Sequence, residues 1–397
     1  MSGIEGIAAV NLPDWMLRDA YGPDVAFNPS PCFRETGWIP QGQHLLHWMS
    51  GGQIAVAGDV PILCHRSTCS PTTLLLLRDV GFPEPSALLP FDTEAEYRQL
   101  LDKCAEDGQR VAFTHVQARD VLRDSVYWIS RDLLCSLNDK GNLRTIAPAE
   151  FLARRELLTA DEFQARPADA NQLPVAVKTA GPLTSGAGYG VKLCRTPGDW
   201  LEAQRQFQSA PRVVVEEWID IAAIWCVQFI ARRNAPARLL GAAEQVSLEH
   251  GGYDGNWIHA EDVAPQHVIE VARRIVEAAA REGFYGVCGI DVVVATDGTI
   301  RVIDPNFRMN GSSVPLALRS WMTERGATVG RSRHWAIEGS LEDMDRIVRR
   351  AVSREHMIPY AMAETSPSAA RVSGLVIGES RDEVRDRIRR LRGEGLS

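Results

Sequence analysis

Short apolar runs separated by turn-forming residues fill the middle of the chain. Five runs of strand length follow one another within residues 173–246: Leu173–Ala180, Gly190–Arg195, Arg212–Ile219, Ile224–Ala231 and Ala237–Val246. Strand runs with short, turn-like breaks are typical of antiparallel pairing, because neighbouring strands then need only hairpin connections. This part of the chain is therefore predicted to form an antiparallel sheet.

Apolar residues at helical spacing predict helices on both sides of this region. The clearest helix begins at Pro265, a residue that suits a first turn, and ends at Gly283. Further helices are expected at Thr93–Glu106, around Glu338–Arg350 and at Arg381–Leu391, with a strand at Arg371–Ile377. Residues 1–130 have a less regular pattern that favours an α/β layout, and the whole chain is predicted to be of the α/β class.

An Asp-Gly pair between two β-branched runs predicts a hairpin that carries acidic residues. A two-residue type I′ turn at Asp297-Gly298 places Asp291 directly opposite Asp304. Asn306, two residues further on, points to the same face. Two carboxylates and an amide oxygen are the hard ligands that Mg²⁺ prefers, with Mn²⁺ as an alternative, while water and phosphate complete the coordination. The alternative interpretation is a surface hairpin with two exposed aspartates.

A glycine-rich loop follows a strand that ends in lysine. Lys178 precedes three glycines at alternate positions, Gly186, Gly188 and Gly190, with Ser185 beside them. Glycine lets backbone N–H groups approach phosphate oxygens, and lysine adds a point charge. The spacing is neither that of a P-loop nor that of a dinucleotide-binding fingerprint. A phosphate-binding loop and a plain flexible hairpin both fit this pattern.

Composition and charge narrow the classes of partner. The chain of 397 residues is 45% hydrophobic and carries a formal net charge of −8, which is typical of a globular protein. An acidic balance argues against nucleic-acid binding, which needs a basic stripe. No apolar run reaches the ~20 residues of a membrane span. Eight cysteines are spread without the spacing of a disulfide framework, so a cytoplasmic protein without membrane partners is expected.

The end of the acidic hairpin resembles the metal-binding segment of the ATP-grasp ligases. Those enzymes carry a strand acid, a turn, and then Glu-x-Asn or Asp-x-Asn followed by arginine, which corresponds here to the run from Asp304 through Asn306 to Arg308. The resemblance implies that Asp291, Asp304 and Asn306 bind the metal ion and that Arg308 holds the transferring group. The first metal ligand is aspartate where the family commonly has glutamate, which shortens its reach.

Two lysines resemble those that face the nucleotide in this family. Lys178, ahead of the glycine-rich hairpin, matches the strand lysine that covers the ATP phosphates together with that loop. Lys140, which follows Asp139, matches a second nucleotide-facing lysine earlier in the chain. The resemblance therefore implies that both lysines neutralise phosphate charge and that Lys178 takes part in catalysis.

A strand end that contains two glutamates resembles the family's adenine hinge. The segment runs from Val213 through Glu216, Glu217 and Trp218 to Ile219. In the family, backbone groups at this point bind the adenine edge and a nearby acid binds a ribose hydroxyl. That acid is left open between Glu216, Glu217 and Asp220, and Trp218 is expected in the core.

The resemblance implies an ATP-grasp fold, in which two α+β subdomains clamp ATP behind an N-terminal α/β domain. The expected divisions are 1–130 for the N-terminal domain, 131–210 for the small subdomain with the glycine-rich loop, and 211–397 for the large subdomain with the metal site. The tail Asn310–Pro315 resembles the branch of pheganomycin-type peptide ligases and related amino-acid ligases of natural-product pathways. Specialised metabolism, such as antibiotic biosynthesis, is the expected setting.

The activity implied is ATP-dependent ligation of a carboxylate to an amine. In the family, a carboxylate attacks the γ-phosphate of ATP to give an acyl phosphate and ADP, and an amine then displaces phosphate. Small-molecule carboxylate and amine substrates are expected, and the sequence leaves open whether the chain forms a homodimer. Two alternatives share the nucleotide groups: a ligase that loads an amino acid onto the thiol of a carrier protein, and a kinase that stops at the phosphorylated product.

A glycine-rich stretch, Ser247–His259, is expected to be a lid on the substrate side. Its three glycines would let it hinge, and Tyr253, Trp257, His250 and His259 would supply apolar and hydrogen-bonding surface. The alternative is an ordinary connection between the sheet and the following helix.

Overall fold

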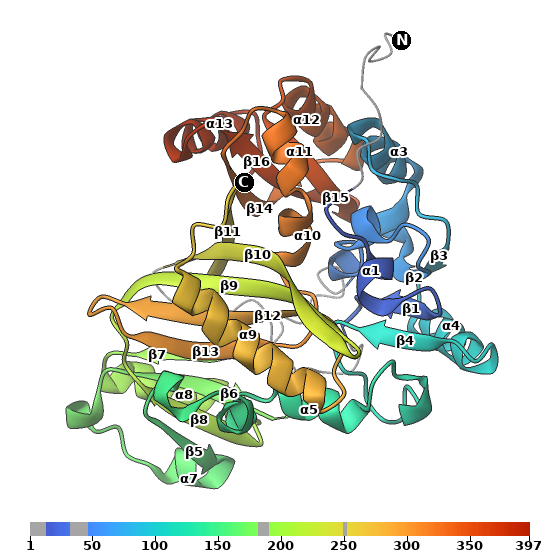
Figure 1. The fold of residues 1–397 in the computed structure, drawn as a ribbon. Helices are drawn as coiled ribbons and strands as arrows, with labels where there is room; N and C mark the ends of the chain where they lie inside the picture. Colours follow the sequence, from blue (N-terminus) through green and yellow to red (C-terminus); the bar gives the residue numbers. More distant parts are fainter. Residues whose placement is uncertain (1–12, 32–46, 182–189, 249–251) are drawn as a thin grey trace.

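The structure is a computed structural model that describes residues 13–31, 47–181, 190–248 and 252–397. The described part of the chain forms three β-sheets with accompanying helices, and the sheets follow one another in the sequence (Figure 1). The predicted combination of α/β and antiparallel parts is confirmed. The five strands expected to form one antiparallel sheet within residues 173–246 instead divide between two sheets, three in the second and two in the third. None of the helices in the described ranges is long and apolar enough to cross a membrane.

The N-terminal sheet is parallel and has the strand order β3-β2-β1-β4. Its strands are β1 (Val25–Asn28), β2 (Ile62–His65), β3 (Leu88–Phe91) and β4 (Arg110–Phe113), and the helices of this segment are α1 (Leu17–Tyr21), α3 (Pro71–Val80) and α4 (Glu94–Glu106). Helix α4 begins one residue later than predicted because Thr93 is its N-cap, whose hydroxyl accepts a hydrogen bond from the Glu96 N–H at 3.2 Å.

A small antiparallel sheet follows, with the order β5-β8-β6-β7. Its strands are β5 (Arg155–Thr159), β6 (Val175–Ala180), β7 (Val191–Cys194) and β8 (Arg212–Glu217), and the helices of this segment are α5 (Arg131–Asn138), α6 (Leu143–Ile146), α7 (Ala160–Ala165) and α8 (Pro197–Gln206). Phe163, Trp200 and Phe207 belong to a hydrophobic core separate from the main one. Because β8 pairs within this sheet, strand pairing favours a boundary after Glu217 over one at residue 210. The three-part division itself stays a proposal.

The largest sheet contains eight antiparallel strands in the order β13-β12-β9-β10-β11-β14-β16-β15. Its strands are β9 (Ile221–Arg232), β10 (Ala235–Ser247), β11 (Tyr253–His259), β12 (Gly286–Ala295), β13 (Ile300–Asn306), β14 (Val329–Glu338), β15 (Met357–Ser366) and β16 (Ala369–Gly378). The helices of this segment are α9 (Gln266–Arg281), α10 (Ser313–Ala317), α11 (Arg319–Glu324), α12 (Leu341–Ser353) and α13 (Arg381–Gly393). Helix α9 lies across β9 and β12 and buries Val268, Ile275 and Val276 (Figure 1).

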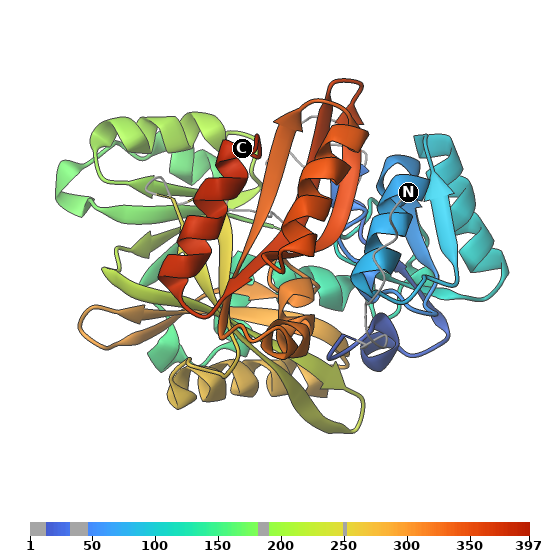
Figure 2. The ribbon, with the colours of Figure 1, turned by 90° about the horizontal axis from the view of Figure 1, so that it is seen from above.

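The N-terminal domain packs beside the far edge of this sheet, next to β15 (Figure 2). The hydroxyl of Thr73 on α3 donates a hydrogen bond to the Met362 carbonyl of β15 at 2.9 Å. This contact joins two segments that lie 289 residues apart in the sequence.

The predicted lid is wrong for the part of it that the structure describes. Tyr253–His259 is strand β11, which pairs with β10 on one side and with β14 on the other. Gly255, which suggested a hinge, has a φ of +102°, and a Cβ atom on it would lie 2.0 Å from the Ser332 carbonyl oxygen. The glycine therefore permits a close approach of two strands. His250 lies outside the described residues.

The hairpin of β12 and β13 has the predicted pairing but a different turn. Gly298 has a φ of +82°, whereas Asp297 does not have positive φ, so the turn is not type I′. The Gly298 N–H bonds to the Ala295 carbonyl, and the Ala295 N–H bonds to the Thr299 carbonyl, which gives a three-residue loop. A bulge at Ile303 then shifts the register by one residue, so Asp291 still pairs with Asp304.

Candidate active site

The β12–β13 hairpin brings the three predicted metal ligands together. Asp291 pairs directly with Asp304, and the side-chain amide N–H of Asn306 donates to Asp291 Oδ2 at 3.4 Å. Asp291 is 8% exposed, and its Oδ1 has no hydrogen-bond donor among the described residues. Burial, and after it the charge of Asp304, raises the pKa of Asp291 to about 6. A buried carboxylate with an open oxygen beside a second carboxylate fits a divalent cation.

The donor set around this hairpin is small. Within the described ranges, no group of three or more His, Cys, Asp or Glu side chains is arranged to hold a metal ion. A cation here would rely on two carboxylates, the amide oxygen of Asn306, and oxygens from phosphate and water. Such a set is typical of Mg²⁺, which usually keeps several waters and binds through one or two carboxylates plus substrate phosphates.

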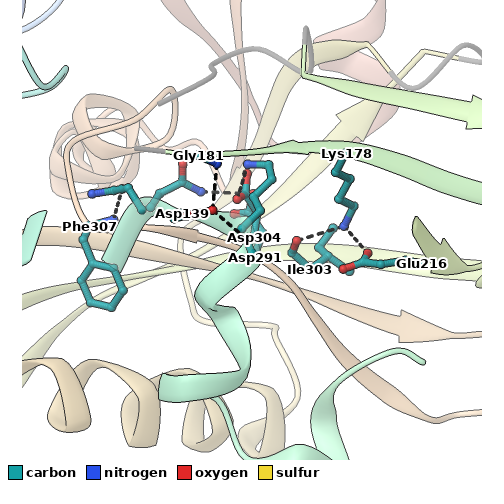
Figure 3. A network of polar contacts seen from close by, with 12 residues as sticks. Asp139, Lys178, Gly181, Glu216, Asp291, Ile303, Asp304 and Phe307 are labelled. Carbon is teal, nitrogen blue, oxygen red and sulfur yellow. Dashed lines mark hydrogen bonds and ion pairs between the residues drawn. The ribbon is translucent and has the colours of Figure 1, made fainter. Parts of the chain in front are cut away.

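Both predicted lysines contact the acidic hairpin. Figure 3 shows Lys178 beside Glu216 and Ile303. Lys140 Nζ lies 2.5 Å from Asp304 Oδ1. Lys178 Nζ lies 2.5 Å from Glu216 Oε2 and donates a hydrogen bond to the Ile303 carbonyl at 3.0 Å. Ile303 is the bulged residue, so the bulge that restores the register also presents a carbonyl to the lysine. Both lysine side chains are buried, which keeps their charges effective at short range.

Asp139 fixes the segment that carries Lys140. Its Oδ1 accepts hydrogen bonds from the Gly141 N–H at 2.8 Å and from the Gly181 N–H at 2.9 Å (Figure 3). Its Oδ2 forms an ion pair with Arg212 at 2.5 Å. The carboxylate thereby ties the lysine segment to the end of β6, where the glycine-rich loop begins. Asp139 was not among the residues predicted from the sequence, although aspartate is a frequent turn residue whose side chain bonds to the backbone two residues on.

The predicted adenine hinge lines a cavity that also contains the acidic hairpin and both lysines. The two glutamates of the hinge differ in how far other residues already bind them. Glu216 is engaged by Lys178 and by Arg155, whose guanidinium lies 3.3 Å from its carboxylate. Glu217 accepts a hydrogen bond from the Arg154 N–H at 2.8 Å. Ile219 lines the cavity at the end of this segment.

Trp218 was expected in the core, and that expectation is wrong. Its ring is partly exposed, lines the cavity, and lies under the guanidinium of Arg195 at 5.0 Å from the ring centroid. Its indole N–H donates to the exposed Asp220 carboxylate at 2.9 Å. The strand has already ended at Glu217, so the alternation that would have directed this side chain inward no longer applies.

Arg308 lies in the cavity wall next to the acidic hairpin. It is 8% exposed, and burial lowers the pKa of its guanidinium while Asp304 and Asp291 oppose that effect. His115 lies close enough that burial and the Arg308 charge together lower its pKa to about 3. His115 is therefore neutral near pH 7, and Arg308 supplies the positive charge at this point.

The N-terminal domain contributes residues that the sequence analysis did not single out. Pro29 follows β1, and Thr114 and His115 follow β4, and all three line the cavity. They lie at the carboxyl ends of parallel strands, which is where open α/β sheets bind ligands. The signal that could have found them is the short apolar segment Val111–Phe113, which is followed directly by the polar residues Thr114 and His115.

The cavity has a volume of about 800 Å³ and is lined by strands of the small and large sheets and by residues that lie outside the strands of the N-terminal domain. Of the predicted glycine-rich loop, Ser185, Gly186 and Gly188 lie outside the described residues. Gly190 is described, and its carbonyl accepts a hydrogen bond from the Thr179 N–H at 2.9 Å in the β6–β7 hairpin.

The turn after Arg308 is held by a polar network beneath the hairpin. Gln228 on β9 donates through its amide to Asn310 and to the Ser312 hydroxyl, and it accepts from the Ser313 hydroxyl at 2.9 Å. Gly289 on β12 leaves room for this network, because a Cβ atom there would lie 2.7 Å from Asn310 Nδ2.

Known structures share the fold of this protein over nearly the whole chain. N5-carboxyaminoimidazole synthase from Aspergillus clavatus, in complex with ADP and 5-aminoimidazole ribonucleotide, is 14% identical, with a TM-score of 0.57 over 94% of this chain and 99% of that one. An L-amino acid ligase from Bacillus licheniformis is 10% identical, with a TM-score of 0.56 over 94% and 97%. These likenesses show the fold, which is the predicted ATP-grasp fold.

The sequence itself matches two family models. Residues 16–135 match the N-terminal domain of L-aspartate–L-methionine ligase, and residues 153–306 match the ATP-grasp domain of the same ligase. The chain belongs to the ATP-grasp carboxylate–amine ligases, in their amino-acid ligase branch, and forms an amide bond at the expense of ATP. The predicted family and reaction are confirmed. The kinase and carrier-thiol alternatives find no support, and the likeness to pheganomycin-type enzymes stays a prediction.

Replacement of one hairpin carboxylate tests the metal ligands. We expect Asp304→Asn to lower turnover by at least roughly 10–100-fold, because mutation even of a residue that only supports a metal ligand typically lowers activity by that factor. The melting temperature should be retained, because the repulsion between residue 304 and Asp291 is relieved. Steady-state ADP release at ordinary Mg²⁺ levels measures this. Asp297→Asn, in the exposed turn of the same hairpin, is the matched control. Wild-type turnover in Asp304→Asn would rule out this residue as a ligand.

Removal of the strand lysine tests the phosphate contact. Lys178→Met is expected to weaken ATP binding roughly 10–100-fold, since a hydrogen bond to a charged group contributes about 1.5–3 kcal/mol. Arg155 remains to pair with Glu216, so the fold should survive. Calorimetric titration with ATP gives the dissociation constant. The control is Lys192→Met, which removes a lysine of the neighbouring strand β7 that pairs with Glu202 on α8; this variant should bind ATP as the wild type does.

A methyl group at position 289 tests the network beneath the site. Gly289→Ala would push into Asn310 and Cys226, so we expect a loss of about 1–3 kcal/mol in the free energy of unfolding, as is usual for overpacking. Denaturant unfolding measures this change. Gly198→Ala, where the new Cβ has ordinary contact at 3.5 Å, serves as the control. Equal stability of both variants would show that the turn after Arg308 adjusts freely.

Proposed function

We propose that this ligase activates L-aspartate with ATP and joins it to the amine of L-methionine. Both matching family models name that pair of amino acids. The observation that carries the proposal is the shared cavity, in which buried lysines, two opposed carboxylates and Arg308 face one space large enough for a nucleotide and two amino acids.

The chain's own residues would bind and orient the reactants. The carboxylate oxygen of aspartate attacks the γ-phosphorus of ATP, and ADP leaves. The methionine nitrogen then attacks the acyl carbon, loses a proton, and displaces phosphate. Lys140 and Lys178 would offset phosphate charge during the first step, and Arg308 would stabilise the phosphoryl group as its charge redistributes.

We further propose Mg²⁺ as the metal of this site, with Mn²⁺ able to replace it, held by Asp291, Asp304 and Asn306. When bound, the cation would neutralise negative charge on the phosphates. The adenine would lie along the segment from Glu216 to Ile219. Glu217 is better placed than Glu216 to receive a ribose hydroxyl, because Glu216 is already engaged by two cations.

Product formation from defined amino acids tests this function. With ATP and Mg²⁺, we expect ADP, phosphate and a dipeptide only when both aspartate and methionine are present, as followed by coupled ADP release and mass spectrometry. ADP release with aspartate alone, at the same rate, would favour a phosphorylating enzyme. No turnover with this pair, but turnover with another pair from a pool of amino acids, would refute the substrate assignment and keep the ligase.

A further inference from the structure

One part of the cavity is built by the last three strands of the large sheet, outside the nucleotide-binding elements. His334 on β14 pairs directly with Ser373 on β16, and Arg371 lies two residues along the same strand, on the same face. Tyr360 on β15 also lines this part. Trp48 of the N-terminal domain packs edge-on against His334, with 6.3 Å between the ring centroids.

The cationic side chains that line the cavity differ in their partners. Lys140 is paired with Asp304 and Lys178 with Glu216. Arg195 lies over the ring of Trp218. The guanidinium of Arg371 has no hydrogen bond or ion pair with any residue in the described part of the chain, although the residue is partly buried.

The two arginines on the neighbouring strand β14, in contrast, are both paired with an anion. Arg331 and Arg333 both form ion pairs with Asp254, each at 2.8 Å. A partly buried guanidinium that lacks an anion loses hydration without compensation. An anion supplied by a ligand would restore that balance at Arg371.

His334 and Ser373, which share this part of the sheet with Arg371, are polar side chains, and Asp254, whose charge also acts on His334, is already paired with Arg331 and Arg333. His334 Nδ1 lies 2.6 Å from the Ser373 hydroxyl, and burial, followed by the charges of Arg371 and Arg333, lowers the pKa of His334 to about 4. The imidazole is therefore neutral near pH 7 and adds hydrogen-bonding capacity only. One guanidinium among neutral hydrogen-bonding side chains suits a carboxylate, which arginine can bind through two parallel hydrogen bonds.

We propose that Arg371 binds the substrate carboxylate that does not react and thereby determines which amino acid is accepted. That carboxylate is either the side-chain carboxylate of the acyl donor or the α-carboxylate of the amine acceptor. The inference rests on the proposed function, because aspartate and methionine each bring one such group. Arg308, beside the acidic hairpin, remains with the reacting carboxyl group.

Substrates that lack one carboxylate distinguish the two sources. We would compare kcat/KM for aspartate against asparagine, and for methionine against methioninamide, in the wild type, Arg371→Met and Arg371→Lys. Arg371→Met should lower kcat/KM for one of the two carboxylate substrates roughly 10–100-fold and leave its amide analogue nearly unchanged. Arg371→Lys should be intermediate, since lysine keeps the charge but loses the two-point geometry. Arg346→Met, an exposed helix arginine, is the control for loss of a positive charge.

Direct binding separates this inference from the proposed function. Calorimetric titration of the wild type and Arg371→Met with aspartate and with methionine should show weaker binding of one amino acid in the variant, whether or not the pair is ligated. Unchanged binding of both, or an undiminished preference for both carboxylates over their amides, would overturn the role of Arg371. Failure of dipeptide formation alone, with Arg371-dependent binding retained, would refute the substrate pair and leave Arg371 as a carboxylate receptor.

Discussion

Two carboxylates held opposite each other in a buried hairpin are the constraint on which the rest of the site depends. Two unit charges about 5 Å apart repel by about 3 kcal/mol at an effective dielectric constant of about 20. Burial, and after it this repulsion, raises the pKa of Asp291. Lys140 offsets part of the repulsion through its contact with Asp304. A divalent cation would offset the remainder, so the hairpin is best stabilised when the metal–nucleotide complex is bound.

The small sheet, the Lys140 segment and the N-terminal domain each place different side chains near this hairpin. The small sheet supplies Lys178, which reaches the carbonyl of the bulged residue Ile303. Asp139 ties the Lys140 segment to the end of β6, so both lysines belong to one connected unit. The N-terminal domain closes the cavity with the carboxyl end of β4, where His115 lies close to Arg308. The two lysines and Arg308 therefore lie around the same pair of acids, Asp291 and Asp304.

The residues predicted from local signals to bind metal and nucleotide, apart from those of the glycine-rich loop, line one cavity, and their roles stay a prediction. The pairing of Asp291 with Asp304 was correct, but for incomplete reasons: the turn contains three residues instead of two, and the bulge at Ile303 compensates for that difference. Such compensation leaves no mark in the alternation of apolar residues. A local pattern can therefore predict the register of a hairpin and still miss its backbone geometry.

The part of the cavity around Arg371 could not be predicted, because it is assembled by pairing between strands that are distant in the sequence. Strands β11, β14 and β15 were not anticipated, and Gly255 suggested a hinge where it allows β14 to approach closely. Arg371 was placed on a strand, but only the pairing of β14 with β16 sets it beside His334. Trp218 was misplaced because strand alternation stops at Glu217. Contacts of this kind depend on the tertiary fold, which no short segment encodes.

The most direct test of the central claim is a crystal structure of the complex with Mn²⁺ and a non-hydrolysable ATP analogue, with anomalous data collected for manganese. The account predicts an anomalous peak between the Asp291 and Asp304 carboxylates, about 2.0–2.3 Å from an oxygen of each, the range of hard-cation bonds. The phosphates of the analogue should lie on the opposite side of the peak, next to Lys178. A nucleotide bound with its metal away from this hairpin, or no manganese within reach of Asp291, would contradict it.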